Sequence, residues 1–166
     1  LSKETAKKIS KQSQFTSLNA QINAANIGYH TMNNYHDIDC TIINETELRH
    51  ELRDRESNLR DLMKQLSKQM NTKNLVVTQG NSGATLYVSN DNKYYHCPAF
   101  ANKVVDKIGS GDAMLALLSC VLKIGMDPNL ALFIGSLAAA QSVEMIGNSA
   151  PVNKKQLLKT FAHAIK

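Results

Sequence analysis

Apolar and polar residues follow two periods along the chain, one typical of helices and one typical of strands. Leucines and methionines recur every three or four residues between Glu56 and Met70, which predicts an amphipathic helix. Nearly unbroken apolar runs stand at Asp39–Ile43 and Leu75–Thr78, and such runs are typical of strands buried on both faces. Strands that alternate with helices predict an α/β fold with a mainly parallel sheet, and we expect a single domain over residues 1–166.

The same patterns place the other elements. Ser2 is a good cap for a polar helix that runs through Gln12. The segment LNAQINAANIGYH, residues 18–30, predicts a strand end, a loop and a short helix. The further elements that we expect are a strand at Phe15–Leu18, a helix from Asn44 to about Asp54, a hairpin of Ala84–Val88 with Lys93–Cys97, and helices at Asp112–Ile124, Pro128–Met145 and Asn153–His163.

Composition excludes several classes of function. The net charge of +5 is modest, and the basic residues are scattered without interleaved aromatics, so we expect no nucleic-acid partner. The longest apolar stretch, Leu130–Ala140, is too short to span a bilayer, so we expect no membrane partner. Three cysteines without a C-x-x-C pair argue against a disulfide framework or a zinc site and favour a cytoplasmic location.

A glycine turn with an acid behind it, Gly109-Ser110-Gly111-Asp112, opens an apolar helix. The glycines let successive amides turn toward one point, and the helix dipole favours an anion there. An aspartate in the first turn can accept a proton from an attacking hydroxyl, or it can simply cap the helix. Met114 replaces the third glycine of a dinucleotide fingerprint, and no Gly-Lys-Ser/Thr follows as in a P-loop.

Two other strand ends carry polar residues. Asn44 and Glu47 follow a predicted strand with the spacing of a capping box, and the same acid could reach metal-bound water. Thr78 ends the next strand, where the glycines at 80 and 83 could let a ligand lie against the backbone. Because ligands of parallel α/β sheets collect where strands end, these corners are candidates for one site, although each is also explained as a cap or a turn.

The order of these motifs resembles the PfkB, or ribokinase-like, family of carbohydrate kinases. The resemblance lies in N-x-x-E at Asn44–Glu47, T-x-G at Thr78–Gly80, a hairpin, and D-x-x-G-x-G-D at Asp106–Asp112, and it continues through residues 138–151. Within the family, NAQINAANIGYH and INETELR look most like the kinase halves of heptose kinase–nucleotidyltransferase proteins. The resemblance implies a three-layer, ribokinase-like (Rossmann-like) parallel sheet, of which this chain is the C-terminal, ATP-binding part.

The resemblance also implies roles for individual residues. It makes Asp112 the catalytic base and gives the anion hole for the transferred phosphoryl group to Gly109, Ser110 and Gly111. Alanine is common in the family where this chain has Ser110, but a small residue is kept. The implied ligands are ATP along Thr78, Gly80, Gly83 and Asn148, Mg²⁺ held through water by Asn44 and Glu47, and a monovalent cation such as K⁺ at Asp106.

Kinases of this family carry an earlier portion that holds the sugar-recognition residues and a lid, and we expect that portion to be missing here. The preferred hypothesis is therefore a part of a carbohydrate kinase that supplies the nucleotide site and the base for phosphorylating a sugar or sugar phosphate. A nucleotide-binding module without turnover, and an inactive remnant or assembly domain, are the alternatives. Exposed sheet edges predict a homo-oligomer or association with an N-terminal half.

Overall fold

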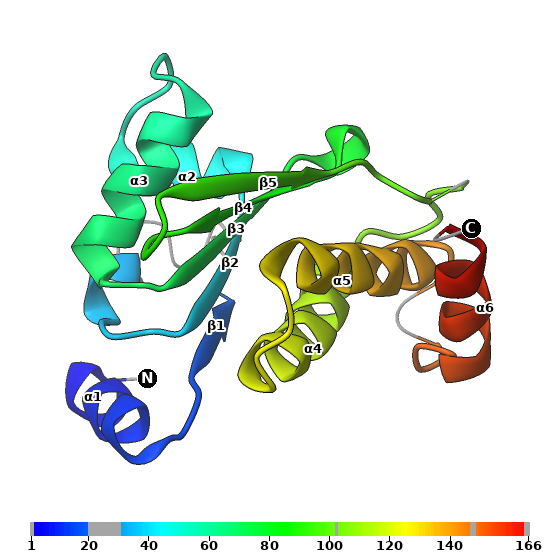
Figure 1. The fold of residues 1–166 in the computed structure, drawn as a ribbon. Coiled ribbons are helices and arrows are strands. Elements are labelled where there is room, and N and C mark those ends of the chain that lie inside the picture. The colour runs from blue at the N-terminus through cyan, green and yellow to red at the C-terminus, as the bar shows by residue number, and fades with distance from the viewer. Residues whose placement is uncertain (1, 20–30, 102, 147–148, 165–166) are drawn as a thin grey trace. The chain divides into compact units, whose positions relative to one another are not determined.

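The computed structural model describes residues 2–19, 31–101, 103–146 and 149–164. They divide into two compact units, residues 1–79 with 85–94 and residues 80–84 with 95–166, and the single domain expected above stays a prediction. The elements of the first part of the chain are α1 (Lys3–Gln12), β1 (Ser17–Asn19), η1 (Met32–Asn34), β2 (Cys40–Asn44), α2 (Glu45–Leu52), α3 (Leu59–Met70) and β3 (Asn74–Thr78). They are followed by η2 (Gly80–Ser82), β4 (Ala84–Val88), β5 (Lys93–Cys97), α4 (Ser110–Lys123), α5 (Pro128–Val143) and α6 (Lys154–Ala164), all shown in Figure 1.

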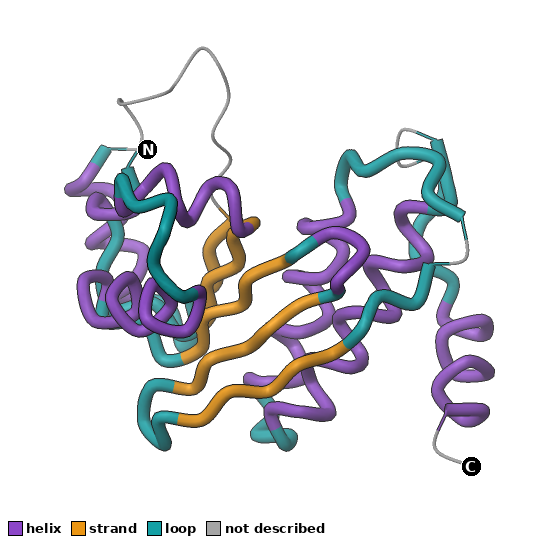
Figure 2. Tube along the Cα trace, turned by 90° about the horizontal axis from the view of Figure 1, so that it is seen from above, coloured by secondary structure: helices purple, strands orange, loops and turns teal. Residues whose placement is uncertain are grey.

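The strands form one five-stranded sheet in the order β1-β2-β3-β4-β5 (Figure 2). The first three strands are parallel, and Asn44 at the end of β2 is the register partner of Thr78 at the end of β3. The amide of Ser89, just after β4, donates to the carbonyl of Lys73, just before β3, so β4 returns antiparallel to β3. The sheet is therefore mixed: the expected parallel pairing is found in β1–β3, and the expected hairpin of β4 and β5 is confirmed.

The first unit has its core between the sheet and two helices. Ile43 and Val77 from the strands pack with leucines and methionines of α2 and α3, and Met32 of η1 joins the same cluster. The amphipathic pattern of α3 thus marks the face that is buried, as expected. Residues that share this core are Ile38, Leu48, Leu62, Met63, Leu66, Met70, Leu75 and Tyr87.

The second unit consists mainly of α4, α5 and α6. A side chain at Gly135 would lie 3.1 Å from Leu118 and 3.2 Å from Met114, so glycine is what lets α5 approach α4 this closely. Phe133 of α5 contacts Phe100 edge-on at 5.3 Å and Phe161 of α6 at 5.8 Å between ring centroids. These aromatic contacts hold the terminal helix and the segment after β5 against α5.

Two helix starts differ from the expected positions. Asp54 accepts hydrogen bonds from the amides of Glu56 and Ser57, which forms a turn, so α3 begins only after its cap Asn58. Gly109 has a left-handed backbone with φ of 80° and is the N-cap of α4, so that helix begins before Asp112. The short helix expected within residues 20–30 lies outside the described residues.

Candidate functional site

The ends of β2 and β3 bring three predicted residues of the first unit together. Asn44 and Thr78 are register partners on neighbouring parallel strands. Asn44 Oδ1 accepts the amide of Glu47 at 2.8 Å, and Glu47 Oε2 accepts the amide of Asn44 at 3.1 Å. The capping box predicted for α2 is therefore confirmed, and it places a carboxylate and a carboxamide beside the hydroxyl-bearing end of β3.

The side chains of the capping box are candidates for holding a magnesium ion. Among the residues that the structure describes, no group of three or more His, Cys, Asp or Glu side chains could hold a metal ion directly. Carboxylate and carboxamide oxygens suit Mg²⁺, which usually keeps several waters in its coordination shell. The side chains of Asn44 and Glu47 therefore fit a magnesium ion reached through water.

Gly80 and Gly83 form the turn between β3 and β4, in the second unit. Both have left-handed backbones, with φ of 57° and 88°. A side chain at Gly83 would meet the carbonyl oxygen of Cys97 at 2.0 Å, whereas a side chain at Gly80 would have nothing within 4 Å. Close packing is therefore enough to explain why residue 83 is a glycine. Of the two glycines, Gly80 is the one with open space beside it for a ligand.

The motif Gly109-Ser110-Gly111-Asp112 forms the first turn of α4. The amides at the start of a helix lack intrahelical partners, and Gly109 has the positive φ that an anion-binding turn needs. Ser110 Oγ donates to the carbonyl of Lys107 at 2.9 Å, so this side chain points back into the preceding loop. Asp112 is solvent-exposed in the first turn, where a negative charge is favourable.

The loop before α4 is tied to the end of α5. The amides of Val105 and Asp106 donate to the carbonyl of Val143 at 2.7 and 3.1 Å. Asp106 Oδ1 accepts the amide of Ile108 at 3.0 Å, an arrangement that holds the approach to Gly109 in one shape. The carboxylate predicted to hold a monovalent cation thus has a structural role at this bend.

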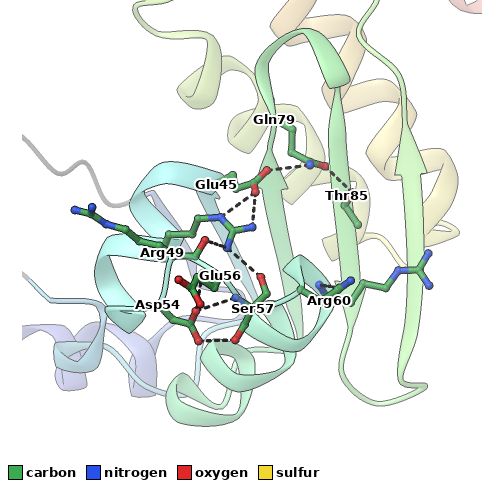
Figure 3. Close-up of polar contacts among 10 residues, drawn as sticks. Glu45, Arg49, Asp54, Glu56, Ser57, Arg60, Gln79 and Thr85 are labelled. Carbon is green, nitrogen blue, oxygen red and sulfur yellow. Dashed lines mark hydrogen bonds and ion pairs between the residues drawn. The ribbon is translucent and has the colours of Figure 1, made fainter.

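A polar network near Thr78 was not anticipated from the sequence. Gln79 donates to Glu45 at 3.0 Å, and Glu45 in turn accepts two hydrogen bonds from Arg49 (Figure 3). Thr85 of β4 donates to the carbonyl oxygen of the Gln79 side chain at 3.1 Å. Glu45 and Arg49 have the i,i+4 spacing of a helical ion pair, and this spacing is a signal in the sequence. It does not indicate the further partner, Gln79, which directly follows β3.

The structure therefore assembles the predicted residues in two sets. Asn44, Glu47 and Thr78 lie together in the first unit, and Gly109–Asp112 form one turn in the second unit with Asp106 at its approach. Asn148, predicted near adenine, lies outside the described residues. Within the described ranges, no helix has the length and apolar character needed to cross a membrane.

Comparison with known proteins identifies the class. Residues 3–155 match the family described as pfkB family carbohydrate kinase. The "Bifunctional protein HldE" of Koribacter versatilis (strain Ellin345) is 36% identical over 107 residues, which are 63% of this chain and 21% of that protein. The structure also superposes on Escherichia coli phosphofructokinase-2 in complex with potassium, with a TM-score of 0.79 at 16% identity, over 99% of this chain and 52% of that one.

A plant enzyme shows the same fold. Arabidopsis thaliana ribokinase complexed with ribose and ATP gives a TM-score of 0.73 at 23% identity, over 95% of this chain and 50% of the ribokinase chain. The chain belongs to the pfkB family of carbohydrate kinases, its fold is ribokinase-like, and its curated relatives include several proteins named "Bifunctional protein HldE". It spans about half the length of these solved kinases and about a fifth of that curated relative.

Proposed function

We propose that this chain supplies the nucleotide site and the catalytic base for ATP-dependent phosphorylation of a sugar or sugar-phosphate hydroxyl. The observation that carries the proposal is the D-x-x-G-x-G-D motif, whose last four residues form the start of α4 with a left-handed glycine at its cap and an exposed aspartate in its first turn. Membership of a carbohydrate kinase family makes phosphoryl transfer the first chemistry to expect from that turn.

In the proposed reaction Asp112 accepts the proton of the acceptor hydroxyl. The hydroxyl oxygen attacks the γ-phosphorus of ATP, the bond to the bridging oxygen breaks, and ADP leaves with that electron pair. Backbone amides at Gly109, Ser110 and Gly111 donate to the oxygens of the phosphoryl group as charge develops on them. Such transfer depends mainly on positioning and on donors aimed at the developing charge, which suits a turn built from small residues.

The remaining residues bind the nucleotide and cations. Thr78 and Gly80 contact the phosphates, Gly83 shapes the turn beside them, and Asn148 lies near the adenine. Asn44 and Glu47 orient waters of a magnesium ion that neutralises phosphate charge. A potassium ion at Asp106 is proposed because Escherichia coli phosphofructokinase-2 has been solved with potassium, and the ATP of the Arabidopsis ribokinase complex supports the nucleotide.

The location proposed for the protein is the cytoplasm. Cys40, Cys97 and Cys120, all of which the structure describes, form no disulfide with one another. Burial raises the pKa of Cys97, so this thiol stays protonated and unreactive at neutral pH. Three cysteines without a disulfide among them suit a reducing compartment.

Calorimetric titration with ATP and Mg²⁺ is the first test. Binding is expected for a kinase part and also for a binding module without turnover, whereas an inactive remnant or an assembly domain would bind no nucleotide. A titration without heat change, repeated at a second temperature, would reject the proposal. Sugar-dependent release of ADP then separates the kinase from the binding module. It is measured with the other half of the kinase fold supplied, because the chain aligns with about half of each solved kinase.

Asp112→Asn tests the catalytic base. The variant keeps the shape of the first turn but cannot take the proton, so ADP release is expected to fall about 10²- to 10⁴-fold while the affinity for MgATP stays unchanged. Asp127→Asn is the matched control, because Asp127 caps α5 through the amides of Asn129 and Leu130 and has no proposed role in the chemistry. Full turnover in Asp112→Asn would remove Asp112 from the mechanism.

A further inference from the structure

The side-chain amide of Gln79 makes hydrogen bonds through both its nitrogen and its oxygen. In the sequence, Gln79 lies between Thr78 and Gly80, two residues of the proposed nucleotide site. Its Nε2 donates to Glu45 Oε2 at 3.0 Å, and its Oε1 accepts from Thr85 Oγ1 at 3.1 Å. The two partners belong to different elements, because Glu45 lies in the first turn of α2 and Thr85 lies in β4. Because its donor and its acceptor are both engaged, the amide is fixed in one orientation.

Glu45 is held in turn by Arg49. Its other oxygen, Oε1, accepts hydrogen bonds from Arg49 Nε at 3.0 Å and from Nη2 at 2.8 Å. Arg49 Nη1 also donates to the carbonyl oxygens of Arg55 at 3.2 Å and Ser57 at 3.0 Å. A continuous chain of polar contacts therefore runs from the loop after α2, through Glu45 and Gln79, to β4 (Figure 3).

The surroundings of this network favour a stable contact. The side chains of Arg49 and Glu45 are only 24% and 31% exposed, and two-point bonding by the guanidinium group fixes the carboxylate better than a single contact would. Arg49 also neutralises the charge of Glu45. An acid can therefore lie one residue from Asn44 without a strong repulsion toward a polyphosphate.

The bridge continues the register of the sheet. Asn44 and Thr78 are paired across β2 and β3, and the residues that follow them, Glu45 and Gln79, are joined by their side chains. The start of α2 and the end of β3 are thus connected twice, once by the strand pairing and once by the bridge. Without the bridge, the backbone beyond Thr78 would lose the hydrogen bond that links Gln79 to α2.

We propose that Glu45 is a positioning residue that acts through Gln79 to set the binding geometry of Thr78 for the nucleotide phosphates. This inference rests on the function proposed above. Small displacements of groups that bind a reacting phosphoryl group are costly, because such sites work by placing donors accurately. The bridge therefore contributes to nucleotide affinity beyond its contribution to folding.

The test measures the affinity for MgATP by calorimetry at a temperature where circular dichroism shows every variant folded. Glu45→Ala and Gln79→Met each remove the bridge and are expected to weaken binding about 3- to 10-fold. The double variant is expected to have about the same affinity for MgATP as the single variant with the lower affinity, because both changes break the same contact. Glu45→Gln keeps an acceptor oxygen toward Gln79 and is expected to recover most of the affinity that Glu45→Ala loses.

Glu4→Ala is the matched control, because it also removes an i,i+4 acid–base pair, with Lys8, but on the exposed surface of α1. Its affinity is expected to equal that of the wild type. If Glu45→Ala and Gln79→Met bind MgATP as the wild type does, or if their effects add fully in the double variant, the positioning role is wrong while the proposed function stands. If the wild type itself binds no nucleotide, the proposed function fails and this inference fails with it.

Discussion

Gly80 and Gly83 lie three residues apart in one turn and both have left-handed backbones, yet their surroundings differ. A Cβ atom at Gly83 would overlap the backbone of Cys97, Pro98 and Ala99, at 2.0 to 2.8 Å. The same atom at Gly80 would enter open space. The sequence presents the two glycines as equivalent, and only the fold separates a glycine needed for packing from one needed for its backbone angle.

Substituting alanine at each position measures this difference. Gly80→Ala is expected to lower the free energy of unfolding by about 1 kcal/mol, the usual cost of a left-handed backbone in a residue with a Cβ atom. Gly83→Ala is expected to lower it by about 3 kcal/mol or more, because the strand end at Cys97 must also move. Urea denaturation of both variants gives the two values. Equal losses would contradict the close packing at Gly83.

At the scale of elements, a hydrogen bond to the side chain of Glu51 ties η1 to α2 in addition to their shared core. Glu51 Oε1 accepts the amide of Met32 at 2.9 Å, and Met32 is only 1% exposed in the core. Burial raises the pKa of Glu51 above its ordinary 4.5, although the hydrogen bonds from the amides of Met32 and Asn33 oppose this shift. The carboxylate thus satisfies the start of η1 while being partly removed from water.

Because the pKa of Glu51 is raised, the direction in which stability changes with pH can be predicted. Between the ordinary pKa and the raised one, the folded protein binds more protons at Glu51 than the unfolded chain does, so stability falls as pH rises through that window. Glu51→Gln still accepts the amide of Met32 but cannot ionise. The wild type is therefore expected to lose stability relative to Glu51→Gln as pH rises from the ordinary pKa of 4.5 through the raised one. Denaturation across this range checks the sign, and a constant difference would contradict it.

The elements themselves were largely predictable, because their signals are local. The run CTII and the hairpin of β4 and β5 were found at their observed positions within a residue or two, and the capping box at Asn44 was found as well. The start of α3 was missed because the side chain of Asp54 makes a turn that competes with the helix. The contact between Glu45 and Gln79 joins residues far apart in the chain, and no periodicity of one element can indicate such a contact.

At the scale of the whole molecule, the two edge strands of the sheet differ in how well they are protected against pairing with another chain. The edge strand β5 carries Lys93, a charged residue of the kind that discourages pairing with another chain. The edge strand β1 consists of Ser17, Leu18 and Asn19 and carries no charge. The chain also spans only about half the length of the solved kinases that it matches. The edge at β1 is therefore the place where we expect another polypeptide to add strands.

This expectation is tested by sedimentation velocity at micromolar concentration, where we predict a dimer or a larger oligomer that associates through β1. Ser17→Lys places a charge on this edge at an exposed position and is expected to shift the protein toward the monomer. Ser13→Lys makes the same change at an exposed position outside the strand and should leave the association unchanged. If the earlier half of the kinase fold is the natural occupant of this edge, adding it should dissociate the oligomer in favour of a one-to-one complex. A wild-type monomer would show that the edge is already protected without a charge, and oligomers that persist in Ser17→Lys would place the contact on another surface.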